Sequence, residues 1–164
     1  MAEVALKPRV VLVDDDPDYC SDLGRHLRAR CELAAVHDAQ SGLEQAVGRR
    51  PEVVLLDIDL GPGPDGLWVL DRLIRETDPP AVIMLSGIEA VDIVVEAMQR
   101  GAFYYFPKAS PLRALIALLE RAAALVRSRR ACSALGIEAT GRADAFVRAD
   151  GVTQRLWKRI RKVA

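Results

Sequence analysis

The chain has 164 residues, of which 51% are hydrophobic, and its 23 basic side chains balance 23 acidic ones. Every apolar run ends well short of the ~18 residues that a membrane-spanning helix needs, and no charged-then-apolar leader precedes a small-residue cleavage site. We therefore expect a cytoplasmic protein with no membrane partner. Three cysteines, odd in number and without C-x-x-C spacing, favour neither a disulfide framework nor a zinc knuckle.

The neutral total charge hides two parts of opposite sign. Residues 1–120 hold 12 Lys/Arg and 20 Asp/Glu, a net charge of −8, whereas residues 121–164 hold 11 and 3, a net charge of +8. The acidic part suggests a cation site. The basic part could contact nucleic acid, an acidic partner or only solvent.

Short aliphatic runs alternate with helix-length stretches along the whole chain. The predicted strands cover residues 9–14, 31–36, 52–57, 81–86 and 102–106. The predicted helices, with apolar residues about 3.6 apart, cover residues 18–30, 39–48, 66–76, 89–100 and 111 to about 130. Five strand-then-helix units in a row indicate an α/β fold with a parallel sheet that is covered on both faces.

Polar residues follow four of the predicted strands. Asp14 and Asp15 end the first strand, Asp57 the third and Ser86 the fourth, and Lys108 comes just after the fifth. Ligands of parallel sheets bind beyond the carboxyl ends of the strands. Carboxylates gathered there would repel one another unless a cation bridged them, and a few hard oxygen ligands favour Mg²⁺.

A simpler interpretation exists for the "DDDP" stretch. Asp14 to Asp16 could merely cap the helix that begins near Pro17, and for Asp16 this is sound. The metal site is favoured because Asp57, Ser86 and Lys108 stand at matching strand ends.

The ordered motifs "LVDDDP", "VVLLDIDL", "MLSG" and "GAFYYFPK" resemble the receiver domain of two-component response regulators over residues 8–127. The resemblance implies a flavodoxin-like, doubly wound sheet of five parallel strands in the order 2-1-3-4-5 with five helices. It also implies that Asp57 accepts a phosphoryl group from a sensor histidine kinase. Mg²⁺ would be bound by Asp15, by Asp14 through water, by Asp57 and by the backbone carbonyl of Asp59.

The resemblance also assigns the remaining site residues. Lys108 would supply a fixed ammonium and Ser86 would donate its hydroxyl to a phosphoryl oxygen. Tyr105 would be the switch aromatic that turns inward when Ser86 is recruited, although it could equally be an ordinary core aromatic. Such a protein is a switch and not a classical enzyme, with Mg²⁺-dependent self-phosphorylation, slow self-dephosphorylation and a change in homodimerisation.

Three features depart from the usual pattern of the family. The loop at residues 59–66 is one residue longer, and serine replaces the commoner threonine at Ser86. Pro107 precedes Lys108, whereas the family commonly has proline after the lysine with a cis bond between them. A cis Lys108–Ala109 bond would cost about 2.5 to 4 kcal/mol, so either the surroundings enforce it or the lysine is placed another way.

The C-terminal part is predicted as a linker at residues 128–145 and a basic amphipathic helical segment at residues 146–164. The stretch "FVRADGVTQRLWKRIRKVA" resembles the opening of the AAA+ ATPase domain of NtrC-type activators of sigma-54 RNA polymerase. No P-loop motif follows, so we expect the output domain to lie outside this chain. The segment is too short for a winged-helix reader, so direct DNA binding is not expected.

An alternative remains open from the sequence. The chain could be a stand-alone receiver adaptor that signals through protein or nucleic-acid contacts of its basic tail, which salt-dependent binding would reveal. A receiver-shaped protein that never takes phosphate is disfavoured by the complete set of Asp15, Asp57, Ser86 and Lys108.

Overall fold

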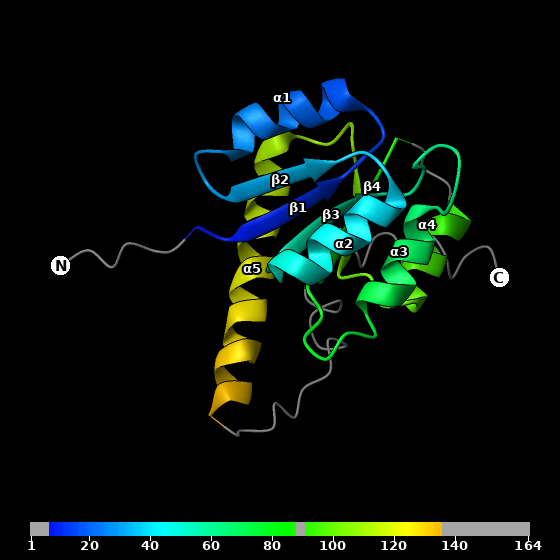
Figure 1. Cartoon of the computed structure of the whole chain (residues 1–164). Helices are drawn as coiled ribbons and strands as arrows, with labels where there is room; N and C mark the ends of the chain where they lie inside the picture. Colours follow the sequence, from blue (N-terminus) through cyan, green and yellow to red (C-terminus); the bar gives the residue numbers. More distant parts are fainter. Residues whose placement is uncertain (1–6, 88–90, 136–164) are drawn as a thin grey trace. The chain divides into compact units, whose positions relative to one another are not determined.

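The computed structural model describes residues 7–87 and 91–135. Five strands form one sheet, all neighbours parallel, in the order β2-β1-β3-β4-β5 (Figure 1). The strands are β1 (Arg9–Val13), β2 (Glu32–Val36), β3 (Val53–Asp57), β4 (Ala81–Ser86) and β5 (Tyr104–Pro107). The helices are α1 (Pro17–Leu27), α2 (Ala39–Arg49), α3 (Gly66–Leu73), α4 (Val91–Gln99) and α5 (Leu112–Ala134). The expected flavodoxin-like fold and strand order are confirmed.

Helices cover both faces of the sheet because the central strands are apolar on both sides. Every residue of β3 and β4 is buried. Val10, Leu12 and Leu55 face a core shared with α1 and α5, and Val11 and Leu56 face a core shared with α2, α3 and α4. Figure 1 shows these two groups of helices on opposite sides of the sheet. This placement leaves the carboxyl edge of the sheet open for polar groups.

Helix starts follow from the capping residues. Asp16 accepts hydrogen bonds from the amides of Asp18 and Tyr19, and Pro17 occupies the first turn of α1. Asp38 accepts from the amide of Ser41 at the start of α2. The capping role expected for Asp16 is thus observed, and it is compatible with a different role for the residues before it.

The last helix is longer than its apolar pattern indicates. We expected α5 to end near Arg130, but it continues to Ala134, so the first residues of the predicted linker 128–145 are helical. At the expected end, Arg130 Nε lies 2.6 Å from Asp78 Oδ2 and its Nη2 donates to the carbonyl of Pro51 at 3.0 Å, and no glycine or proline follows before Ala134. The basic segment 146–164 lies outside the described residues.

Candidate functional site

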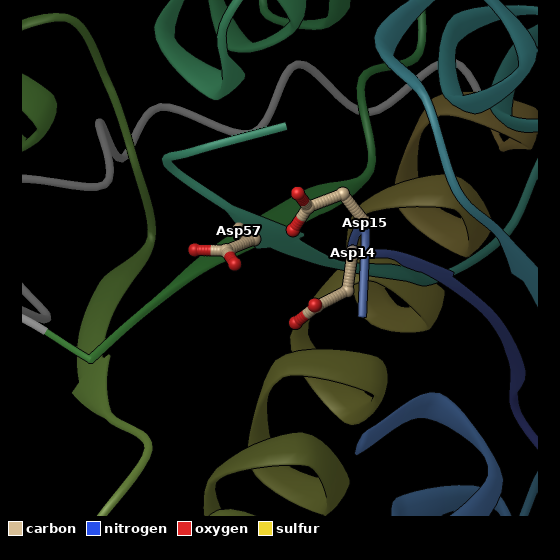
Figure 2. Close-up of side chains that lie close together, drawn as sticks. All are labelled: Asp14, Asp15 and Asp57. Atoms are coloured by element: carbon tan, nitrogen blue, oxygen red, sulfur yellow. The ribbon is translucent and has the colours of Figure 1, made fainter. Parts of the chain in front are cut away.

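Three carboxylates meet at the carboxyl edge of the sheet. Asp14 and Asp15 directly follow β1, and Asp57 ends β3. β1 and β3 are parallel neighbours in which Val13 pairs with Leu56, so the residues beyond this pair lie at one edge. One ligand oxygen from each carboxylate lies within 4.8 Å of the others, and Figure 2 shows the three side chains together. The structure therefore brings together the three carboxylates that were predicted from the sequence to bind Mg²⁺.

Asp14 is fully buried, with 0% of its surface exposed. Its amide donates to the carbonyl of Val36 at 3.1 Å, and its Oδ1 accepts from the amide of Asp16 at 3.1 Å. Oδ2 lies 2.6 Å from Lys108 Nζ as an ion pair. No group in the described ranges donates a hydrogen bond to Oδ2. A buried oxygen that lacks a donor is well suited to bind a cation.

Asp57 is also buried, and both of its oxygens are engaged. Oδ1 accepts from the amide of Ile58 at 2.7 Å, and Oδ2 accepts from Lys108 Nζ at 2.6 Å. Burial raises the pKa of Asp57; the hydrogen bond from Lys108 opposes that shift, and the charge of Asp14 adds to it. The negative charge of Asp57 is therefore costly without a nearby cation.

Lys108 supplies one such cation. Its amide donates to the carbonyl of Ser86 at 2.8 Å, which ties it to the end of β4. Burial alone would lower the pKa of Lys108, but the close carboxylates of Asp14 and Asp57 together outweigh burial and raise it. Three carboxylates and one ammonium leave a net charge of −2 (−3 + 1) at this edge. This charge and the oxygen ligands fit Mg²⁺.

The peptide bond after Lys108 is trans, because the described residues contain no cis peptide bond. The surroundings therefore do not enforce a cis bond, and the lysine is placed another way. Lys108 reaches both Asp14 and Asp57 without a cis bond.

Ser86 and Tyr105 lie on the neighbouring strands. Ser86 is buried at the end of β4 and pairs in register with Pro107. Tyr105 is half-buried in β5 and packs against the core shared with α2, α3 and α4, whereas Phe106 is only 5% exposed and packs on the other face. Among the aromatic residues at the end of β5, Tyr105 thus differs from Phe106 in both face and exposure.

Asp59 lies in the exposed loop after β3. Its Oδ1 accepts from the amide of Gly61 at 3.1 Å, so its side chain shapes the loop, and Asp59 is not one of the three clustered carboxylates. Gly61 and Gly63 adopt positive φ angles of 73° and 129°, which glycine tolerates best. The metal-binding role of the Asp59 carbonyl stays a prediction.

Two residues at the site escaped the sequence analysis. The ammonium of Lys108 lies 4.5 Å from the ring centroid of Tyr19, in the first turn of α1. Gly66 begins α3, and its amide donates to the carbonyl of Ile58 at 2.8 Å. The sequence places Tyr19 two residues after Pro17, and therefore near the acidic stretch. Sequence spacing does not tell which way the side chain points, so the contact with Lys108 could not be predicted.

Within the described residues, no helix is both long enough and apolar enough to cross a membrane.

Known proteins resemble this chain over the region that carries the site. Residues 10–120 match the response regulator receiver domain. The transcriptional activator protein PfeR of Pseudomonas aeruginosa is 40% identical over 124 residues, which cover 75% of this chain and 39% of PfeR. The nitrogen assimilation regulatory protein NtrX of Azorhizobium caulinodans is 34% identical over 123 residues, covering 74% of this chain and 27% of NtrX.

A solved structure gives the same result. NtrX from Brucella abortus in complex with ADP is 30% identical, with a TM-score of 0.72 over 83% of this chain and 31% of that one. The chain spans well under half the length of these relatives. Because the family match covers residues 10–120, the region in which the carboxylates and the lysine meet, the chain belongs to the response regulator receiver domain family.

Proposed function

We propose that Asp57 accepts a phosphoryl group from the phosphohistidine of a sensor histidine kinase. One observation carries the proposal: Asp57 Oδ2 lies 2.6 Å from Lys108 Nζ, in a cluster where Asp14 and Asp15 offer further oxygens within 4.8 Å. A carboxylate held between an ammonium and a cation site can act as a nucleophile toward an anionic phosphoryl group.

The transfer exchanges one bond for another. A carboxylate oxygen of Asp57 attacks phosphorus, a P–O bond forms and the P–N bond to the kinase imidazole breaks. The imidazole leaves with the bonding electron pair and takes up a proton. Asp57 must be ionised to attack, and Lys108 favours that form by opposing the effect of burial on its pKa.

Charge neutralisation is the main catalytic requirement of such a transfer. Mg²⁺ held by Asp14, Asp15, Asp57 and the Asp59 carbonyl would supply positive charge beside the phosphoryl oxygens. Lys108, which follows β5 at the same edge of the sheet, supplies an ammonium. Ser86, whose carbonyl accepts from the amide of Lys108, would donate its hydroxyl to a phosphoryl oxygen.

The output of the switch is transcription control. Tyr105 would turn inward as Ser86 is recruited, and the change would alter homodimerisation. The likeness to NtrX supports an NtrC-type, sigma-54-dependent regulator whose AAA+ domain lies outside this chain, and the likeness to PfeR supports transcription control more generally. We place the switch in the cytoplasm, where response regulators generally act.

The phosphoacceptor is tested by intact mass after incubation with acetyl phosphate. We expect one added phosphoryl group that requires Mg²⁺, that is lost in Asp57→Asn and that persists in Asp22→Asn, since Asp22 is an exposed residue of α1 outside the cluster. No adduct on the wild-type protein, or an adduct that survives in Asp57→Asn, would overturn the proposal.

The output is tested separately. We expect the natural reading frame to continue beyond Ala164 into a P-loop sequence, and we expect beryllofluoride to change the sedimentation of the protein. A stop codon after Ala164, together with salt-dependent binding of the tail to an acidic partner or nucleic acid, would instead establish the stand-alone adaptor.

A further inference from the structure

Tyr19 presents the face of its ring to the ammonium of Lys108. Lys108 Nζ lies 4.5 Å from the ring centroid, within the distance at which a cation is attracted to an aromatic face. The ring is half-buried and packs against the core shared with α1 and α5. The ammonium therefore lies against the carboxylates of Asp14 and Asp57 and against the ring of Tyr19.

The start of α1 fixes the place of the ring. The amide of Tyr19 donates to Asp16 Oδ1 at 3.0 Å, and Pro17 limits the backbone on the preceding side. The next residue, Cys20, is buried with its Sγ 3.6 Å from the carbonyl of Asp14. The first turn of α1 is thus tied to the acidic stretch through Tyr19 and Cys20, and packing against the core limits where the ring of Tyr19 can lie.

The ring stays a neutral aromatic face at neutral pH. Burial raises the pKa of Tyr19, the charges of Asp14 and Asp57 add to this shift, and Lys108 opposes it. A neutral phenol keeps the negative quadrupole of its face and carries no charge that would compete with the carboxylates.

We propose that Tyr19 is a positioning residue that holds the ammonium of Lys108 over the phosphoacceptor. This inference rests on the proposed function. When Asp57 becomes a phosphoaspartate, the carboxylate oxygen that now accepts from Lys108 changes its charge and its geometry. The ring face is unaffected by the state of Asp57 and, unlike the carboxylate of Asp14, is not a ligand for Mg²⁺. Tyr19 thus gives the ammonium a partner that is the same before and after transfer.

The test compares variants that keep the ring with variants that lose it. Tyr19→Phe keeps the aromatic face, and Tyr19→Leu keeps apolar volume without it. We expect the rate of phosphorylation by acetyl phosphate to be near that of the wild type for Tyr19→Phe and to fall about 3- to 10-fold for Tyr19→Leu, the range that loss of a cation–ring contact implies.

A spectroscopic measurement reads the contact without phosphorylation. The protons next to the Lys108 nitrogen should show an upfield ring-current shift in the wild type and in Tyr19→Phe, and should lose it in Tyr19→Leu. Mono-, di- and trifluorophenylalanine at position 19 keep the shape of the ring while weakening its face. We expect the rate to fall stepwise along this series, which also covers the case in which Tyr19→Leu folds poorly.

The outcomes separate the two proposals. Equal rates in the Phe and Leu proteins, a rate unchanged along the fluorine series or the absence of a ring-current shift would overturn the role of Tyr19. An absent adduct on the wild-type protein would overturn the phosphoacceptor, and the Lys108 shifts would still decide whether Tyr19 holds the ammonium.

Discussion

The carbonyl oxygen of Asp57 occupies the space that a side chain on Gly66 would need. A Cβ atom at Gly66 would lie 2.0 Å from that oxygen and 3.0 Å from the Cα of Ile58. Since backbone atoms cannot give way as a flexible side chain does, α3 can begin at this point only with glycine. The phosphoacceptor strand and the start of α3 are in this way placed against each other.

Gly66→Ala should therefore disturb both stability and phosphorylation. We expect a loss of about 1–3 kcal/mol in the free energy of unfolding, as for other overpacked sites, and slower modification of the displaced Asp57. Urea denaturation and intact mass measure the two effects. Gly48→Ala is the control: its Cβ would meet nothing within 4 Å inside α2, so it should stabilise by about 0.5–1 kcal/mol. Equal effects at the two positions would contradict the prediction.

The pKa of Asp57 predicts how stability responds to pH. Burial raises the pKa of Asp57 in the folded state above its value in the unfolded state. The ionised carboxylate therefore destabilises the fold, and this loss of stability develops as the pH rises from the unfolded-state pKa to the folded-state pKa. Asp57→Asn should thus raise the free energy of unfolding at neutral pH. The gain should vanish below about pH 4, near the ordinary pKa of aspartate. Denaturation at several pH values measures it, and a gain that does not depend on pH would show that charge is not its cause.

Removing Lys108 should leave Asp14 buried beside Asp57 without a cation. We expect Lys108→Met to lower the free energy of unfolding by about 3 kcal/mol, as when one partner of a buried ion pair is lost. Added Mg²⁺ should restore more stability to this variant than to the wild type. Thermal melts with and without Mg²⁺ measure both, with Lys7→Met as control, because Lys7 is exposed and its ammonium donates to the carbonyl of Arg28. No extra stabilisation by Mg²⁺ would argue against a shared role for the two cations.

Asp15 offers a test of the cation site that should spare the fold. Asp15 is exposed and contributes one of the three clustered carboxylates. Asp15→Asn should lower the affinity for Mg²⁺ roughly 10-fold or more with little change in stability. Titration calorimetry measures the affinity, and Asp18→Asn, an exposed aspartate one turn away in α1, should bind Mg²⁺ like the wild type. Equal losses in both variants would indicate an unspecific effect of charge.

The end of α5 depends on contacts with the opposite edge of the sheet. Arg130→Met should lower stability by about 1–2 kcal/mol, because Arg130 pairs with Asp78 and donates to the carbonyls of Arg50 and Pro51. Amide hydrogen exchange should quicken over the last turns of α5. Arg113→Met, at an exposed position near the start of the same helix, should leave exchange unchanged. Unchanged exchange in Arg130→Met would mean that helix propensity alone extends α5.

The parallel sheet and the edge where the site lies followed from local patterns, whereas the order of the strands was implied by the resemblance to receiver domains. Apolar runs that end in Asp14, Asp57 and Ser86 were enough to predict the sheet and the meeting of its carboxyl ends. What escaped prediction depends on partners far apart in the chain or on side-chain direction. The contact of Arg130 with Asp78 joins residues 52 positions apart, and no local sequence pattern predicts it.

Side-chain direction limited the prediction in the same way at the site itself. The sequence shows Asp14 and Asp15 as equivalent neighbours, yet Asp14 is fully buried and Asp15 exposed. The ring of Tyr19 likewise belongs to the site only because the cap at Asp16 sets the first turn of α1. These differences appear only when the backbone path from β1 to α1 is known.

Three adjacent aspartates with identical chemistry perform three tasks that cannot be exchanged. Asp14 pairs with Lys108 in the interior, Asp15 offers its oxygens at the surface, and Asp16 caps α1. Only their order along the exit from β1 distinguishes them. Deleting any one of the three therefore produces the same shortened sequence. Each deletion has the same defect, because two aspartates remain for three tasks.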